Sequence, residues 1–122
     1  EGLSVLLVED NELNMEIAKF IIENEGANVT CATNGKEAVN IYKKSPEFFD
    51  IILMDIMMPE MDGYEATKVI RSLDSNIPIV AMTANAFTED KMKAKKAGMN
   101  AHLSKPLDKD RLIQVVAKFC KK

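Results

Sequence analysis

The chain has 122 residues, 47% of them hydrophobic, and a formal net charge of −3 at pH 7. This length suits one domain with a real core, and the composition excludes a disordered chain. The negative charge argues against a nucleic-acid-binding module, and the longest apolar runs are too short to span a bilayer. The two cysteines, Cys31 and Cys120, lack metal or redox spacing and are interpreted as reduced thiols of a cytosolic protein.

In the first part of the chain, residues 3–8, which are apolar except for Ser4, predict a buried strand. The next segment predicts a helix that ends near Gly26. The apolar face of this helix is predicted to consist of Leu13, Ile17, Phe20 and Ile21. A second strand is predicted at 28–33, and Asn34 and Glu37 then have the spacing of a capping box that opens a helix.

The rest of the chain repeats this alternation of strands and helices. The remaining strands are predicted at residues 50–54, 77–82 and 100–103. Asp62 and Glu65 open a helix that reaches about Leu73, and a weakly amphipathic helix ends at Gly98. The last helix has an apolar face made of Leu112, Val115, Val116 and Phe119. Apolar strands separated by helices predict a parallel sheet covered on both faces, a three-layer α/β sandwich that forms one domain over residues 1–122.

Polar side chains follow four of the five predicted strands. In chain order they are Glu9 and Asp10, Asp55, Thr83 and Lys105. Taken singly, each has a structural explanation, such as a helix cap, a solvated acid or a surface lysine. Because ligands bind beyond the carboxyl ends of the strands in such sheets, the joint pattern favours a functional site.

Asp55 follows the apolar run Ile51 to Met54, where desolvation makes an ionised carboxylate costly. Carboxylates that share a pocket also repel one another, and each pair at about 4 Å costs on the order of 4 kcal/mol when the effective dielectric is about 20. A cation must offset this cost, and ligation by oxygen atoms alone suits Mg²⁺. A nearby lysine and threonine suit phosphoryl oxygens, and one carboxylate can act as a nucleophile that forms an acyl phosphate.

Four segments match a known family: LLVEDNELN, DIILMDIMMPEMDGYE, IPIVAMTA and GMNAHLSKPLDKDRL. With them the chain resembles a receiver domain of two-component signalling, the phosphoacceptor part of a response regulator. VEDNELN, AMTANAF and GMNAHLSKP resemble the receivers of hybrid sensor histidine kinases. The resemblance implies a flavodoxin-like α/β fold, in which a doubly wound, five-stranded parallel sheet of order 2-1-3-4-5 is covered by five helices.

The resemblance also implies a role for each acidic residue. Asp55 would be the phosphoacceptor, and Asp10 and Asp55 would ligate Mg²⁺ together with the backbone carbonyl of Met57. Glu9 would complete the pocket through a metal-bound water.

Three further positions would act on the phosphoryl group or respond to it. Thr83 would hydrogen-bond a phosphoryl oxygen and move on activation, and Lys105 would pair with another phosphoryl oxygen. His102 stands where the family often has Tyr or Phe, so it is either a polar strand residue or a switch residue that titrates near neutral pH.

These roles describe a phosphorylation switch. Asp55 would accept a phosphoryl group from a phosphohistidine on a histidine kinase or a histidine phosphotransfer domain, and the acyl phosphate would hydrolyse with the help of the domain's own Mg²⁺. Such a domain is a signalling module rather than an enzyme, although a hybrid protein that contained it would be a kinase.

We expect a cytoplasmic location, or the cytoplasmic part of a membrane-anchored hybrid kinase. We expect no direct contact with nucleic acid or membrane, and a homodimer would form through the fourth helix, fifth strand and fifth helix.

Three alternatives stay open. Magnesium-dependent phosphohydrolases also use an aspartyl nucleophile, but they carry a second Asp two residues later, where this chain has Met57. A flavin- or nucleotide-binding module would need a phosphate-cradling loop after the first strand, whereas EDNELN is acidic. A degenerate receiver would only bind partners, and the intact set of acids argues against it.

Overall fold

The computed structural model describes residues 3–45, 47–55, 63–73, 76–83, 92, 95–104 and 109–119. Its strands are β1 (Ser4–Val8), β2 (Asn28–Ala32), β3 (Ile51–Asp55), β4 (Ile79–Thr83) and β5 (Ala101–Ser104). Its helices are α1 (Glu12–Asn24), α2 (Gly35–Lys44), α3 (Gly63–Arg71) and α5 (Lys109–Phe119). All five predicted strands are therefore present, with limits that differ from the prediction by two residues at most.

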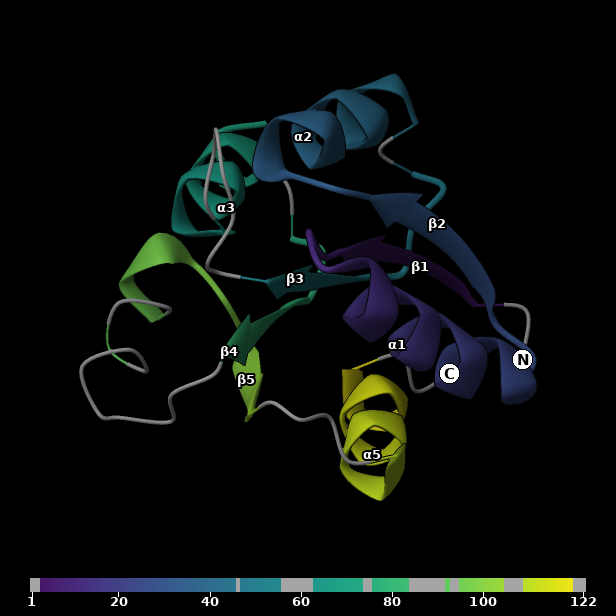
Figure 1. Cartoon of the computed structure of the whole chain (residues 1–122). Coiled ribbons are helices and arrows are strands. Elements are labelled where there is room, and N and C mark those ends of the chain that lie inside the picture. The colour runs from purple at the N-terminus through teal and green to yellow at the C-terminus, as the bar shows by residue number, and fades with distance from the viewer. Residues whose placement is uncertain are drawn as a thin grey trace.

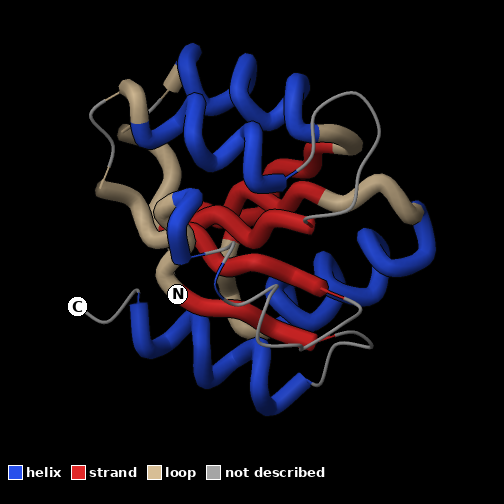
Figure 2. Tube along the Cα trace, turned by 90° about the vertical axis from the view of Figure 1, so that its left-hand side faces the viewer, coloured by secondary structure: helices blue, strands red, loops and turns tan. Residues whose placement is uncertain are grey.

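The strands form one parallel sheet in the order β2-β1-β3-β4-β5. Figures 1 and 2 show helices on both sides of this sheet, with α1 and α5 on one face and α2 and α3 on the other. Every residue of β1 and β3 is buried, which explains why these strands are apolar on both faces. The predicted strand order and the three-layer sandwich are confirmed.

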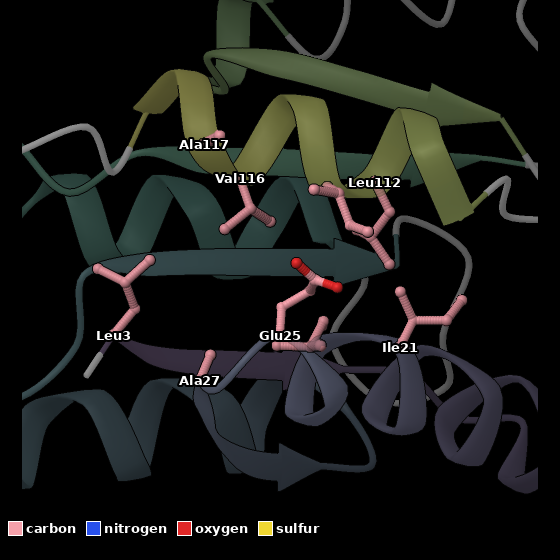
Figure 3. Close-up of a pocket in the computed structure, with 9 residues that line it drawn as sticks. Leu3, Ile21, Glu25, Ala27, Leu112, Val116 and Ala117 are labelled. Atoms are coloured by element: carbon pink, nitrogen blue, oxygen red, sulfur yellow. The ribbon is translucent and has the colours of Figure 1, made fainter. Parts of the chain in front are cut away.

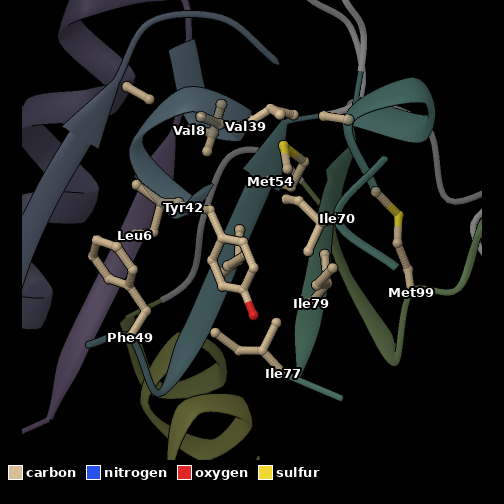
Figure 4. Close-up of a cluster of buried hydrophobic side chains, with 14 of the residues drawn as sticks. Leu6, Val8, Val39, Tyr42, Phe49, Met54, Ile70, Ile77, Ile79 and Met99 are labelled. Atoms are coloured by element: carbon tan, nitrogen blue, oxygen red, sulfur yellow. The ribbon is translucent and has the colours of Figure 1, made fainter. Parts of the chain in front are cut away.

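Alternate side chains of each strand enter two separate halves of the core. Val5 and Leu7 of β1 pack on the side of α1 and α5, whereas Leu6 and Val8 pack on the side of α2 and α3. Figure 4 shows the second half, in which Tyr42 of α2 lies over the sheet. Both faces of the sheet thus contribute to stability.

Asparagine side chains open two of the helices. Oδ1 of Asn11 accepts from the backbone N–H of Asn14 at 3.0 Å, and Oδ1 of Asn34 accepts from that of Glu37 at 2.7 Å. Oε1 of Glu37 accepts in turn from the backbone N–H of Thr33 at 2.6 Å. The predicted capping box at the start of α2 is confirmed, with Thr33 as the reciprocal donor in place of Asn34.

The predicted apolar face of α1 is wrong at three of its four positions. Leu13, Ile17 and Phe20 are 65%, 46% and 71% exposed, and only Ile21 is buried as predicted. The residues of α1 that are buried against the sheet are Met15, Ala18, Ile21 and Ile22. The helix carries two apolar stripes of helical spacing, and the stripe with the small Ala18 lies against the sheet because it allows close approach.

The predicted fourth helix falls mostly on residues outside those described. Residues 95–97 are helical, and Gly98 follows them in a turn with φ of 105°. This left-handed conformation favours glycine and ends the helix where it was predicted to end. The predicted capping residue Asp62 also lies outside the described residues.

Cys31 on β2 is a free, partly buried thiol, in agreement with the prediction. Burial raises its pKa, and the positive charge of Lys19 opposes this effect only in part. The side chain is therefore held in the thiol form at neutral pH. Cys120 lies outside the described residues.

Arg71, at the end of α3, joins the start of β4 to the turn before β5. Its Nη1 donates to the carbonyl of Ile77 at 2.7 Å, and its Nε and Nη2 donate to the carbonyl of Gly98 at 3.0 and 2.7 Å. Nη2 also donates to Oδ1 of Asn100 at 2.8 Å, and the same oxygen accepts from the backbone N–H of Ile79 at 2.9 Å. Burial lowers the pKa of this guanidinium, which nevertheless stays charged.

Candidate metal and phosphoryl site

Three carboxylates meet at the carboxyl edge of the sheet. One ligand atom from each of Glu9, Asp10 and Asp55 lies within 4.8 Å of the others. Glu9 and Asp55 are each only 2% exposed, whereas Asp10 is exposed to solvent. The predicted meeting of these residues is confirmed, and it follows from the parallel pairing of β1 with β3.

The local backbone explains how each acid reaches this edge. Asp55 is the last residue of the fully buried strand β3. Glu9 follows β1, and its N–H donates to the carbonyl of Ala32 at 3.0 Å, so the chain stays attached to β2 beyond the end of the strand. Oε2 of Glu9 accepts from the N–H of Asn11 at 3.1 Å, whereas its Oε1 is buried. The loop that caps α1 therefore also holds the Glu9 carboxylate in place.

The electrostatics of this cluster favour a cation. Burial penalises the ionised forms of Glu9 and Asp55, and their mutual repulsion adds to the penalty. The donor set consists of carboxylate oxygens only, which suits a hard divalent ion such as Mg²⁺ rather than a metal that prefers nitrogen or sulfur. Because Asp10 is exposed, one side of the cluster is open to water and to a molecule that approaches from solvent. The residues present thus fit magnesium.

The remaining predicted site residues are described only in part. Thr83 is the last residue of β4 and pairs in register with Ser104, the last residue of β5. Asp55 pairs with Met82, so the backbone of Thr83 lies at the same edge of the sheet as Asp55. Met57 and Lys105 lie outside the described residues, and Lys105 directly follows β5.

His102 lies on β5, opposite Ala81 of β4, and is half-buried. Both readings of this residue, as a polar strand position and as a switch, are compatible with that place. Its role as a switch stays a prediction.

The exposed stripe of α1 is a feature near the site that the sequence pattern assigned wrongly. It consists of Leu13, Ile17 and Phe20, which we call the α1 stripe. Because α1 begins at Glu12, directly after the acidic cluster, Leu13 lies in the first turn beside the site and Phe20 lies about 10 Å further along the helix. The sequence gives one sign of this stripe: α1 has two sets of apolar residues at helical spacing, and only one of them can face the sheet.

Comparison with known proteins agrees with this geometry. Residues 5–117 match the response regulator receiver domain family. Hybrid signal transduction histidine kinase B of Dictyostelium discoideum is 43% identical over 128 residues, which cover 93% of this chain and 6% of that protein. Eight curated relatives are all histidine kinases or sensor proteins, and the chain spans only 6% to 14% of their length.

Two solved structures are also similar. The receiver domain of sensor histidine kinase PA1611 from Pseudomonas aeruginosa has a TM-score of 0.91 and 35% identity, covers both chains fully, and holds a magnesium ion in its active-site cleft. The receiver domain of Ssk1 from Saccharomyces cerevisiae, crystallised with the histidine phosphotransfer protein Ypd1, has a TM-score of 0.91 and 32% identity over 97% of this chain and 88% of that one. In the part of the chain that the structure describes, no helix is long and apolar enough to cross a membrane.

Proposed function

Because the chain belongs to the response regulator receiver domain family, and is thus a receiver domain of phosphorelay signalling, we propose that Asp55 is its phosphoacceptor. The observation that carries this proposal is the burial of Asp55 at the end of β3, within 4.8 Å of two other carboxylates. A rigid strand fixes the direction of this carboxylate, and the exposed side of the cluster leaves room for a donor. Positioning and charge neutralisation are most of what phosphoryl transfer requires from a protein.

The reaction is a transfer from nitrogen to oxygen. One carboxylate oxygen of Asp55 forms a bond to phosphorus while the bond between phosphorus and the imidazole nitrogen of a phosphohistidine breaks. Water later attacks the acyl phosphate, which restores the carboxylate and releases inorganic phosphate. The chain promotes both steps on itself, so it acts as a signalling domain that turns over its own modification.

Magnesium would be held by Asp10 and Asp55, by the backbone carbonyl of Met57, and by Glu9 through a water. When bound, the ion supplies positive charge that offsets the carboxylates and the incoming phosphoryl oxygens. Glu9 keeps its place through its hydrogen bond from Asn11, which orients the acidic pocket before the ion enters.

Thr83 and Lys105 would contact the phosphoryl oxygens, since Thr83 ends β4 and Lys105 follows β5, and both strands end at the same edge of the sheet as Asp55. The hydroxyl of Thr83 would donate to one oxygen and the Lys105 ammonium would pair with another. Movement of Thr83 toward the phosphoryl group would then bias the fourth helix and β5, with His102 as a responding residue.

The partner that delivers the phosphoryl group would be a histidine kinase or a histidine phosphotransfer domain, as in the complex of Ypd1 with Ssk1. The α1 stripe supports this, because it places exposed apolar side chains next to the acidic pocket. We propose further that residues 1–122 form one receiver domain of a hybrid histidine kinase, a context supported by the name of the Dictyostelium relative. The domain would be cytoplasmic, on its own or as the cytoplasmic part of a membrane-anchored kinase. A homodimer through the fourth helix, β5 and α5 is a further proposal.

The modified residue can be located directly. After incubation with magnesium and a phosphorylated phosphotransfer partner, borohydride reduction converts an acyl phosphate into an alcohol that survives peptide mapping. We expect the reduced residue to be Asp55. Reduction at Glu9 or Asp10 with Asp55 unchanged would contradict the assignment.

A Phe20→Asp variant is expected to lose transfer from the phosphorylated partner by at least about tenfold, because a central apolar contact becomes a buried charge. Phosphorylation by a small acyl phosphate should be unchanged, since Phe20 does not belong to the acidic cluster. The matched control is Phe48→Asp, which changes an aromatic residue that is 55% exposed on another surface of the molecule. Equal transfer rates for the two variants would show that the partner does not bind the α1 stripe.

A further inference from the structure

A cavity of about 150 Å³ lies between α1 and α5, at the end of the sheet opposite the acidic cluster. Figure 3 shows its walls, with Ile21 and Ala27 below and Leu112 and Val116 above. Leu3 closes it where β1 begins, whereas the acidic cluster follows the other end of that strand. Five strand residues rise about 17 Å, so the two places are separate.

One charged side chain, that of the solvent-exposed Glu25, lines this apolar space. Figure 3 shows the Glu25 carboxylate reaching toward α5, between the pair Leu3 and Val116 on one side and the pair Ile21 and Leu112 on the other. Glu25 is the residue that caps the carboxyl end of α1. A carboxylate flanked by apolar walls attracts a cation that can also bury a hydrocarbon body.

The end of α1 adds to the negative potential at this cavity. The last turn of the helix has no basic residue, and Glu23 and Glu25 lie within it and beside it. The carboxyl end of a helix carries a partial negative charge, which acidic neighbours make less favourable and a cation makes more favourable. On the α1 side of the cavity, charge complementarity therefore favours a positively charged occupant, whereas the last turn of α5 carries Lys118.

The volume sets the size of that occupant. An apolar cavity of about 150 Å³ accommodates a single aromatic ring. We propose that the cavity between α1 and α5 is a binding site for a small amphipathic ammonium compound, whose ring lies among Ile21, Leu112 and Val116 and whose charge pairs with Glu25. Because the site lies away from the acidic cluster, its occupant does not compete with the phosphoryl group or with magnesium.

The proposal is tested with 2-phenylethylammonium as the probe and the uncharged 2-phenylethanol as its matched analogue. Methyl resonances of the wild-type protein are followed during titration by NMR. We expect the ammonium to bind in the millimolar range, with shifts at the methyl groups of Ile21, Ile22, Leu112 and Val116. Since a partly exposed ion pair contributes little, the alcohol should bind about two- to fivefold more weakly.

Two variants separate charge from shape. Glu25→Gln should make the ammonium and the alcohol bind equally, and Ala117→Leu should abolish binding of both by filling the cavity from the exposed side of α5. Glu47→Gln is the matched control for loss of one exposed charge and should change nothing. Shifts centred elsewhere, equal affinity of the two probes for the wild type, or binding that survives Ala117→Leu would each overturn the proposal.

Discussion

An Asp55→Asn variant is expected to be more stable than the wild type in the absence of divalent cations, by about 2 kcal/mol in the free energy of unfolding. The wild type holds two buried carboxylates, Glu9 and Asp55, beside a third at Asp10, and the substitution removes one charge without changing the size of the side chain. Native proteins seldom become more stable when a buried residue is changed, so the direction of the effect would show that the three carboxylates repel one another in the folded state.

Magnesium should reverse this order. Binding to the folded state alone adds RT ln(1 + [Mg²⁺]/Kd) to stability, about 2.7 kcal/mol when the ion is present at 100 times its Kd. The wild type should gain this stability and the variant should gain little, because the variant lacks one of the three clustered carboxylates that would hold the ion. Urea unfolding with and without magnesium measures both effects, with Glu16→Gln as the control for loss of an exposed acid. A variant that is less stable than the wild type without magnesium would contradict the account of the cluster.

Replacing Arg71 with alanine is expected to lower the free energy of unfolding by about 3 kcal/mol. The change leaves the carbonyls of Ile77 and Gly98 and the side chain of Asn100 without a charged donor. Arg71→Lys should recover only a small part, because an ammonium cannot donate along the several fixed directions that the guanidinium uses.

Urea unfolding again provides the measurement for Arg71, with Arg111→Ala as the control. Arg111 is exposed on α5, and its substitution should change stability by less than about 0.5 kcal/mol. Gly98→Ala should also lower the free energy of unfolding, because the backbone has φ of 105° and a Cβ at that position would lie 3.0 Å from Cγ of Arg71. Equal stabilities of Arg71→Ala and Arg111→Ala would show that the contacts of Arg71 contribute nothing.

The sheet and its acidic edge were predictable because both depend on short-range patterns. Strand β3 is apolar at every position before Asp55, its last residue, and parallel strands place the residues at their carboxyl ends at one edge of the sheet. Once β1 and β3 are neighbours, Glu9, Asp10 and Asp55 must approach one another. The strand order itself came from the family resemblance, since periodicity does not determine which strands pair.

Other features depend on packing that a local pattern does not contain. On α1, both the stripe with Leu13 and Phe20 and the stripe with Met15 and Ala18 have helical spacing, and only the sheet determines which of them is buried. The role of Arg71 depends on carbonyls that lie 6 and 27 residues away along the chain. The cavity between α1 and α5 exists only after two helices from opposite ends of the sequence lie side by side.

Phosphorylation of Asp55 with the help of magnesium is tested most directly by the intact mass of the protein after incubation with Mg²⁺ and a small acyl phosphate. Asp55→Asn and a sample in which a chelator removes the ion are measured beside the wild type. We expect a gain of one phosphoryl group in the wild type with magnesium and no gain in the other two samples. A gain in Asp55→Asn equal to that of the wild type would show that Asp55 is not the phosphoacceptor.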